Sequence, residues 1–184
     1  MIGTVRVSRI SLQFASLVMS LLFIACASTK FSDTWMDETY QGPPQKVLVI
    51  NAFPNPVNRR LFEDELVKEL KDHRIDAVAS YTFMPSPVVS DKNVIAAQAQ
   101  EMGADTVLIN RPIGTRMGES GGSGNLTYED LYIKTQTDVY DMKSNRLVLS
   151  ASAETWIRQG SPFSSRIHSY VKDLVNRLSL EGLF

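Results

Sequence analysis

Hydrophobic and polar positions divide the chain into three parts. A predominantly apolar run without charged residues occupies residues 10–25, and a polar stretch that ends in Gly42-Pro43-Pro44 follows it. From residue 46 onwards, short apolar runs alternate with segments that are apolar on one face only. Polar segments that end in proline behave as stiffening spacers. The pattern therefore predicts a cleavable leader, a tether and a single folded domain, over residues 1–25, 26–45 and 46–184 respectively.

The first half of the domain has an α/β pattern. Residues 46–53 contain the run Val-Leu-Val-Ile, which is typical of a strand that is covered on both faces. Asn55-Pro56 then supplies a helix cap and a proline at the first helical position. The helix continues with an apolar face at a four-residue spacing, formed by Phe62, Leu66 and Leu70.

The opposite face of this helix carries charges. Arg59 stands four residues before Glu63, and Arg60 stands four residues before Asp64. This spacing lets two ion pairs form on one helix surface. We therefore expect both pairs on the outer, solvated face, and we interpret Glu63, Asp64 and Glu65 as surface carboxylates and not as an acid/base site.

Two more strands follow, with a helix between them. Residues 75–83 and 104–110 have the composition of strands, and Ser90-Asp91 begins a short helix that Gly103 ends. Alternation of strands and helices implies right-handed crossovers and parallel pairing. The sequence therefore predicts a three-stranded parallel arrangement in this half.

The second half of the domain alternates with a period of two. Residues 128–141 and 147–157 place aliphatic and polar side chains on opposite faces, and the turn 142–146 contains Asn145. Ser161-Pro162 opens a last helix, which has an apolar stripe and stops before Gly182. We predict a mixed α+β fold in a single domain, a parallel part extended by an antiparallel hairpin, in the order β-α-β-α-β-β-β-α.

Charge and length narrow the function classes. Removing residues 1–25 from the 184-residue chain leaves 159 residues, with 17 basic and 20 acidic side chains and a net charge of −3. A nucleic-acid-binding domain would carry a basic patch or stripe. We therefore expect no nucleic-acid partner.

The leader ends at the only cysteine of the chain, Cys26. Arg6 and Arg9 precede the apolar run, no acidic residue occurs before Asp33, and the small residue Ala25 lies just before the cysteine. Sixteen apolar residues are short for a membrane-spanning helix, which needs about 20. The segment resembles the lipobox of bacterial lipoproteins, although Phe23 stands where leucine is usual and Leu22 is adjacent.

The lipobox resemblance implies a processing site and a cellular location. In that family the chain is cut between the residues that correspond to Ala25 and Cys26, and the cysteine carries at least two fatty-acyl chains such as palmitate. Two chains make a stable membrane anchor, whereas one gives only marginal binding. Ala27 follows in place of the aspartate that retains lipoproteins at the inner membrane, so the resemblance implies an outer-membrane protein that faces the periplasm.

The rest of the chain is also similar to known proteins. The segments W-M-D-E-T-Y-Q-G-P, K-V-L-V-I, R-R-L-F-E-D-E-L, G-A-D-T-V-L-I and L-V-L-S-A resemble those of a group of uncharacterised Gram-negative lipoproteins. More distantly, the order of elements is similar to the periplasmic α/β domain of the curli-secretion lipoprotein and the penicillin-binding-protein-activator lipoproteins. Those proteins act in assembly and docking and are not enzymes. The resemblance therefore implies an envelope protein partner and no catalysis.

Candidate chemistry is sparse. Residues 118–122, Gly-Glu-Ser-Gly-Gly, look like the surroundings of a trypsin-like serine, but that mechanism needs a histidine base held by a carboxylate. His73 and His168 belong to predicted helices far apart in the chain. Two separated histidines and one lipid-modified cysteine do not make a zinc site. We therefore assign no catalytic residue, no metal ligand and no cofactor.

The most favourable place for binding follows from the predicted topology. Ligands of α/β sheets gather beyond the carboxyl ends of parallel strands. The predicted loop over residues 110–125 would lie there and is long for a connection within a domain. The candidate binding edge consists of Asn55, Arg59, Arg111, Arg116 and Tyr128. Two interpretations of the loop stay open, a binding loop for an anionic partner and a solvated connection.

Three functions are compatible with these observations. The favoured hypothesis is a non-catalytic binding or assembly module of the cell envelope, which uses the loop edge or an exposed strand. The alternatives are a hydrolase that acts on envelope glycan or lipid, and a purely structural lipoprotein.

Overall fold

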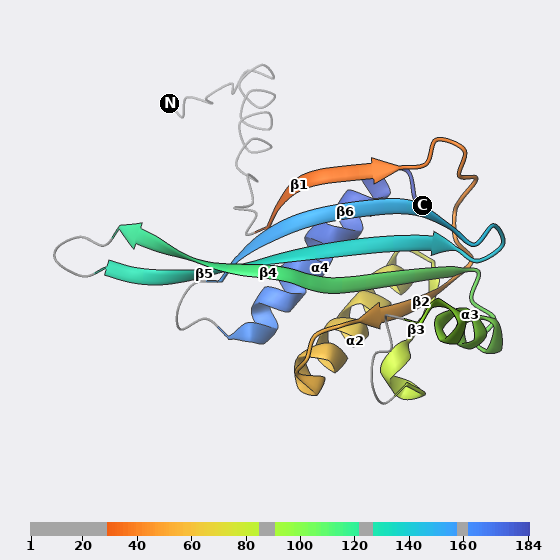
Figure 1. Ribbon diagram of the computed structural model, residues 1–184, viewed down its shortest axis with the longest axis horizontal. Coiled ribbons are helices and arrows are strands. Elements are labelled where there is room, and N and C mark those ends of the chain that lie inside the picture. Colours follow the sequence, from red (N-terminus) through yellow and green to blue (C-terminus); the bar gives the residue numbers. More distant parts are fainter. Residues whose placement is uncertain (1–28, 85–90, 122–126, 158–161) are drawn as a thin grey trace, which may run out of the picture.

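The domain is built on one six-stranded sheet in the order β1-β6-β5-β4-β2-β3 (Figure 1). The structure is a computed structural model, and it describes residues 29–84, 91–121, 127–157 and 162–184. Its elements, in chain order, are β1 (Thr29–Met36), β2 (Lys46–Asn51), α2 (Pro56–Asp72), β3 (Asp76–Ala79), η1 (Ser80–Thr82), α3 (Lys92–Glu101), β4 (Thr106–Gly121), β5 (Thr127–Asp141), β6 (Arg146–Ile157) and α4 (Phe163–Leu180). The mixed α+β prediction is confirmed, with one strand more than expected.

The parallel part agrees with the sequence pattern. β2 pairs in parallel with β3 on one side and with β4 on the other, so it is covered by strands along both edges. Asn55 caps α2 by accepting hydrogen bonds from the amides of Val57 and Asn58, and Asp91 caps α3 in the same way. The predicted second strand is shorter than expected, because the chain turns into η1 after Ala79.

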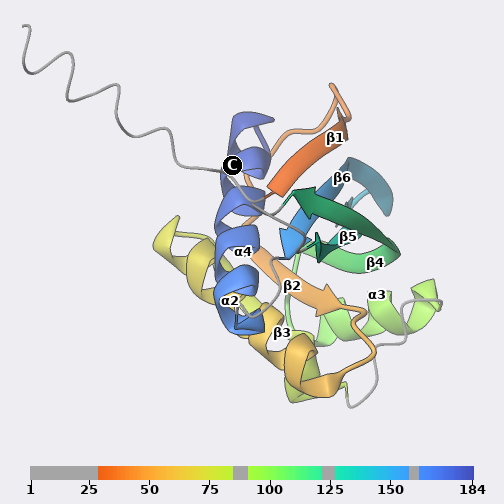
Figure 2. The same ribbon diagram turned by 90° about the vertical axis from the view of Figure 1, so that its left-hand side faces the viewer.

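Helices cover the two faces of the sheet unequally. α2 and α4 lie side by side on one face, and α3 covers only the β2 and β4 region of the other (Figure 2). The larger core contains Val47, Val49, Leu108, Val139 and Leu149 from the sheet and Phe62, Leu66, Val171, Leu174 and Leu178 from the two helices. The smaller core contains Leu48, Ile50, Val107 and Ile109 with Ile95 and Ala99 of α3. No helix in the described part of the chain is long and apolar enough to cross a membrane.

The expected loop over residues 110–125 is wrong up to Gly121. This stretch continues β4, which pairs with β5 residue by residue from Thr106 to Gly121. Pro112 is accommodated because the register shifts between it and Gly114, so the strand tolerates a residue without an amide hydrogen. β4 and β5 together form a hairpin that projects beyond the helices (Figure 1). Residues 122–126 lie outside the described residues.

The expected tether is also wrong for residues 29–36. They form β1, an edge strand that pairs antiparallel with β6 from Thr29↔Thr155 to Met36↔Leu149. Phe31 and Met36 pack against the larger core, and the guanidinium of Arg177 lies 5.8 Å from the Phe31 ring. The folded domain therefore includes residues that the composition alone assigned to a spacer.

The proposed leader and lipidation site, over residues 1–25 and at Cys26, lie outside the described residues and stay predictions.

Candidate functional site: the open face of the sheet

The carboxyl ends of the parallel strands hold a buried network. Glu63 is fully buried and accepts four hydrogen bonds, from the Asn51 amide at 2.9 Å, Arg59 Nε at 3.0 Å, Ser80 Oγ at 2.9 Å and the Tyr81 amide at 2.8 Å. The predicted Arg59–Glu63 pair does form, but its expected exposure is wrong. The pair faces the sheet because the carboxylate satisfies backbone amides where β2 and β3 end. These groups hold the fold together and leave no charge for a ligand at this position.

A second buried network joins α4 to the middle of the sheet. Asn110 Nδ2 donates to Thr137 Oγ1 and to the Tyr170 hydroxyl, both at 2.8 Å, and its Oδ1 accepts from Asn51 Nδ2 at 3.0 Å. The Tyr170 hydroxyl also lies 2.8 Å from Thr135 Oγ1. Burial raises the pKa of the Tyr170 hydroxyl, because the phenolate loses its hydration there. This network is structural as well, since its members satisfy one another.

The accessible surface of interest lies on the other side of the sheet. Over β1, β4, β5 and β6, no described element covers the face opposite α2 and α4 beyond the edge of α3. We call it the open face. Strand register places on it Lys30 and Trp35 of β1, Ser150, Ser152 and Glu154 of β6, Lys134, Gln136 and Asp138 of β5, and Arg111, Ile113 and Arg116 of β4.

Hydrogen bonds hold the polar side chains of the open face in place. Arg111 pairs with Asp138 at 2.8 Å, and Asp138 accepts from Ser150 Oγ at 2.8 Å. Arg116 pairs with Glu154, and its guanidinium lies 3.7 Å from the centre of the Tyr132 ring. The hydrogen bond from Arg116 keeps the pKa of Glu154 below its ordinary value. The open face is therefore ordered before any partner arrives, which lowers the entropy cost of binding.

Two large apolar side chains stand among these charges. Trp35 is 51% exposed and lies beside Ser150, while Ile113 is 53% exposed at the irregular point of β4. Exposed tryptophan and arginine are the residue types that contribute most to protein interfaces. Their position on a rigid sheet, and not on a loop, gives the surface a fixed shape.

A hollow borders the open face where α3 meets the sheet. It offers about 190 Å³ and is lined by Lys92, Ile95, Ala96, Val107, Ile109, Arg111, Tyr140, Met142 and Asn145. Burial raises the pKa of the Tyr140 hydroxyl, with Asp138 adding to the effect. The hollow is smaller than the clefts of about 300–1,000 Å³ that bind most small ligands. It suits one inserted side chain of a partner.

The residues of the predicted binding edge lie in three places. Arg111 and Arg116 both extend from β4 to the open face, Asn55 caps α2 and Arg59 is buried. Tyr128 belongs to the outer part of β5, opposite Ser120. The open face itself was missed, because residues 29–36 and 110–121 were not recognised as strands. The alternation of Lys134, Gln136 and Asp138 with Ile133, Thr135 and Thr137 was the available signal.

The trypsin-like pentapeptide is described only in its backbone up to Gly121. Residues 118–121 end β4, where a β-carbon on Gly118 would come within 2.7 Å of the Tyr132 ring. His73 ends α2 and His168 pairs with Glu65 at 2.6 Å, both among helices and away from this strand. Within the described ranges, no cluster of histidine and acidic residues could hold a metal ion.

Comparison with known proteins shows a shared fold. No protein-family model and no curated protein matches the chain. Among solved structures, the PelC dodecamer from Paraburkholderia phytofirmans is similar with a TM-score of 0.54 and 15% identity, over 82% of this chain and 96% of that chain. Lipoprotein GNA1162 from Neisseria meningitidis is similar with a TM-score of 0.51 and 15% identity, over 74% of this chain and 99% of that chain. The fold therefore occurs in a bacterial lipoprotein, whereas a likeness to the curli-secretion or penicillin-binding-protein-activator lipoproteins is not shown.

Proposed function

We propose that this chain is a non-catalytic envelope lipoprotein that binds a protein partner through the open face of its sheet. The observation that carries the proposal is the open face itself, a rigid surface that combines exposed Trp35 and Ile113 with paired charges. Surfaces of mixed polarity with an exposed aromatic anchor are typical of protein interfaces. A hollow of about 360 Å³, lined by Lys30, Ile113, Lys134 and Glu154 among others, gives side chains of such a partner room to enter the open face.

The anchor and the location complete the proposal. Cys26, preceded by Ala25, carries the lipid, and Ala27 directs the protein to the outer membrane, where the domain faces the periplasm. The fold shared with lipoprotein GNA1162 from Neisseria meningitidis is compatible with an envelope lipoprotein. Two acyl chains hold the domain on the membrane permanently, so the partner meets it there.

The chemistry of the hollow beside α3 favours binding over catalysis. Its described walls combine aliphatic side chains with Arg111 and Lys92, and no carboxylate of the described residues lines it. Burial raises the pKa of Asp173, but this carboxyl group lies on α4 and hydrogen-bonds to Thr29, away from the hollow. A general acid would need such a group beside a substrate cleft.

Site-specific photo-crosslinking in intact cells tests the proposal. A photoreactive amino acid is placed at Lys134 or Ser152 on the open face, and at Lys68 or Lys172 on the exposed side of α2 and α4 as matched controls. We expect discrete adducts from the two open-face positions and none from the helix positions. Adducts from the helix positions alone would contradict the proposal, and so would the absence of adducts at every position, which a purely structural lipoprotein predicts.

The mass of the adduct identifies the kind of partner. The similar PelC protein is described as a dodecamer, and this chain has an exposed edge strand, β1, beside the open face. An adduct of twice the chain mass would identify the partner as a second copy. A different mass would identify another envelope protein, which peptide sequencing then names.

A further inference from the structure

One end of the sheet has an apolar face that its helices do not cover. β4 and β5 run past the start of α4, so their outer residues have no helix opposite them (Figure 1). On the helix side, one row across the strands contains Thr115, Ile133, Thr155 and Thr29. The next row outward contains Met117, Leu131 and Ile157, one row beyond Thr29, the first described residue of β1.

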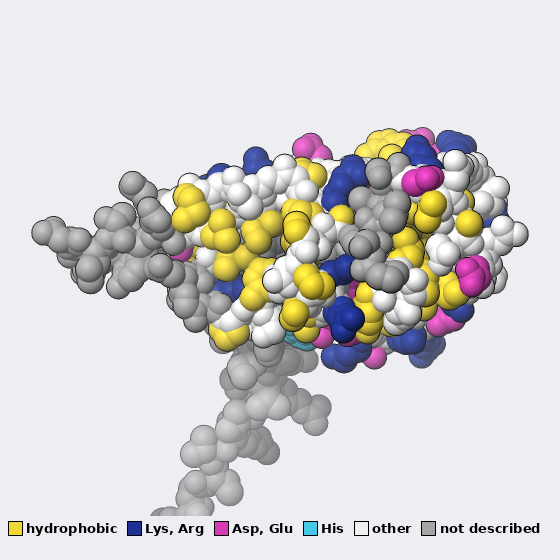
Figure 3. Space-filling view, turned by 60° about the horizontal axis from the view of Figure 1, so that its bottom comes forward, with side chains coloured by type: hydrophobic (Ala, Val, Ile, Leu, Met, Phe, Trp, Pro, Cys, Tyr) yellow, Lys and Arg dark blue, Asp and Glu magenta, His cyan; other side chains and the backbone are white. Residues whose placement is uncertain are grey.

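Aromatic side chains extend this surface toward the helices. Phe53 follows β2 and Phe163 begins α4, and their rings meet edge to face at 6.4 Å. We call Met117, Leu131, Ile133, Ile157, Phe53 and Phe163 the apolar end. Met117 is 60% exposed and the other five are half-buried. Figure 3 shows hydrophobic side chains gathered on this side of the molecule, next to the projecting hairpin.

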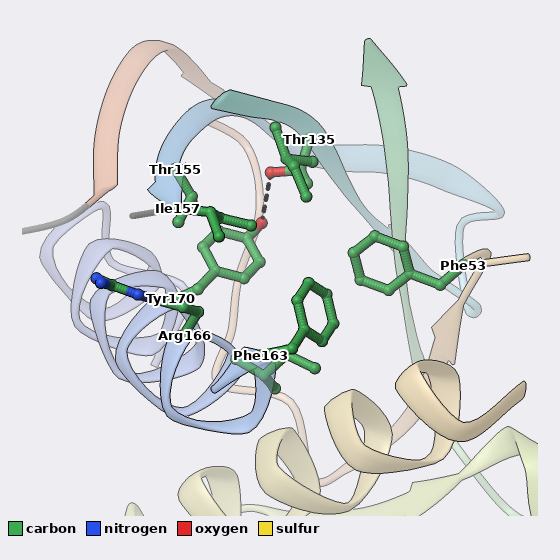
Figure 4. A pocket seen from close by; sticks show the side chains of 9 residues that line it. Phe53, Thr135, Thr155, Ile157, Phe163, Arg166 and Tyr170 are labelled. Atoms are coloured by element: carbon green, nitrogen blue, oxygen red, sulfur yellow. Dashed lines mark hydrogen bonds between the residues drawn. The ribbon is translucent and has the colours of Figure 1, made fainter. Parts of the chain in front are cut away.

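The apolar end is a surface and not a ligand pocket. The space between Phe53, Phe163 and Tyr170 measures about 30 Å³ (Figure 4). A water molecule occupies about this volume in the liquid, and an acyl chain needs far more. A contiguous apolar surface on a folded domain marks contact with a membrane or a protein.

The course of the chain indicates which of these covers it. Thr29, the first described residue, lies beside Thr155 in the row next to Ile157, so the point to which residue 28 is joined belongs to this end of the sheet. Cys26 precedes Thr29 by three residues, which span at most about 11 Å of extended chain. Ile157 lies two residues beyond Thr155 along β6, or about 7 Å. A lipid on Cys26 is therefore held within reach of the uncovered row.

We propose that the apolar end rests on the membrane into which the Cys26 lipid inserts, with Met117, Leu131 and Ile157 in contact with the lipid interface. This inference rests on the lipid anchor of the proposed function. Contact of the apolar end with the membrane fixes the orientation of the domain, because the three residues from Cys26 to Thr29 are too short to let the opposite end reach the membrane. The far ends of β1 and α4, with Trp35 and Leu180, then point away from the membrane, where a partner can approach.

The two tryptophans of the chain report this orientation. Trp156 precedes Ile157 at the end of β6 nearest the anchor, in the row of Tyr132 and Arg116 on the opposite face of the sheet, and Arg166 of α4 lies 6.0 Å from its ring. Trp156 therefore reports on the depth of this end of the sheet. Trp35 lies near the other end of β1, opposite Ser150. Trp35→Phe leaves Trp156 as the only reporter, and Trp156→Phe leaves Trp35 as the matched control.

Quenching by brominated phospholipids measures which tryptophan touches the membrane. The lipidated protein is reconstituted in phosphatidylcholine vesicles with and without bromine on the acyl chains. We expect Trp156 to lose most of its emission in brominated vesicles and Trp35 to keep its emission. Met117→Glu should weaken the quenching of Trp156, whereas Leu180→Glu, the same kind of change at a more exposed position of the other end, should not.

Three results would overturn the inference: equal quenching of both tryptophans, quenching of Trp35 alone, or quenching of neither. If a second copy covered the apolar end instead, Trp156 would be shielded from brominated lipid, and its emission would depend on the density of protein in the vesicles.

A parallel sample distinguishes the absence of lipid on Cys26 from a wrong orientation of the domain. The mass of the amino-terminal peptide shows whether Cys26 carries lipid in cells. A chain that begins at Cys26 is also coupled through this only thiol to a maleimide phospholipid, which supplies an anchor by chemistry. Quenching of Trp156 in the coupled sample without natural lipid would refute the anchor and leave the apolar end as a membrane-binding surface. Lipid on Cys26 without quenching would refute the orientation alone.

Discussion

Glu63→Ala removes the acceptor at the centre of the buried network where β2 and β3 end. The side chain is fully buried, and its two oxygens accept from the amides of Asn51 and Tyr81, from Arg59 and from Ser80. Loss of one partner from a buried ion pair costs about 3–5 kcal/mol. Each buried amide that loses its acceptor adds about 1–3 kcal/mol where water cannot replace it.

These contributions overlap, because a cavity at residue 63 would admit some water. We expect Glu63→Ala to lower the free energy of unfolding by about 5 kcal/mol, comparable with the whole stability of a marginal domain. Glu63→Gln keeps one acceptor oxygen and should lose about half as much. Asp64→Asn is the matched control, because Asp64 is exposed and accepts a hydrogen bond from the Tyr81 hydroxyl at 2.6 Å. This change should cost less than about 1 kcal/mol.

Urea unfolding of a chain that begins at residue 27, followed by circular dichroism and tryptophan fluorescence, measures these differences. A double-mutant cycle with Arg59→Met isolates the ion pair, and we expect the double variant to be about 3 kcal/mol more stable than the sum of the single losses predicts. A Glu63→Ala loss no larger than that of Asp64→Asn would refute the assignment of Glu63 as the organising acceptor.

Further predictions concern the core, the open face and the anchor. Tyr170→Phe should lower the stability by about 1–2 kcal/mol in the same urea assay, because Asn110 and Thr135 lose a shared partner. Since burial raises the pKa of Tyr170 above that of an unfolded tyrosine, near 10, the contribution of Tyr170 to stability should stay constant below about pH 10 and fall as the pH rises further. Tyr170→Phe should reduce this alkaline fall, and an unchanged pH profile of unfolding would contradict the shift. Arg116→Glu breaks an exposed ion pair, so it should change the melting temperature little while weakening the open-face crosslinks; loss of folding instead would assign Arg116 a structural role. Cys26→Ala should abolish labelling by radioactive fatty acid and leave the precursor unprocessed, and unchanged labelling would place the lipid elsewhere.

Local signals predicted most elements of this fold correctly. Asn55-Pro56 begins α2, Gly103 follows α3 with a φ of 64°, and Asn145 turns the β5–β6 hairpin with a φ of 54°. Each of these signals acts within a few residues, through a cap or a backbone conformation that the residue type favours. The α/β character of the first half and the antiparallel hairpin of the second were therefore readable.

Two strands were not readable because their partners lie far away in the sequence. β1 is polar in composition and forms only because β6, more than a hundred residues later, offers an unpaired edge. The outer half of β4 contains proline and glycines, and the long strand β5 keeps it extended. Tertiary pairing overrides weak strand preference in both cases.

The candidate site divides in the same way. The four-residue spacing predicted that Arg59 pairs with Glu63. The pair is buried because Ser80 and Asn51, at the ends of two strands, hydrogen-bond to it. Arg111 and Arg116 were expected to be loop residues, and the pairing of β4 with β5 placed both on the open face.

The sequence by itself determined the kinds of elements, their order and the candidate lipidation site at Cys26, because these depend on patterns a few residues long. Only the tertiary structure decided which face of the sheet stays open and which carboxylate is buried. It also decided that Thr29, three residues after Cys26, lies beside the apolar end. Those features depend on which distant segments meet, since strand pairing and burial are collective properties of the folded chain.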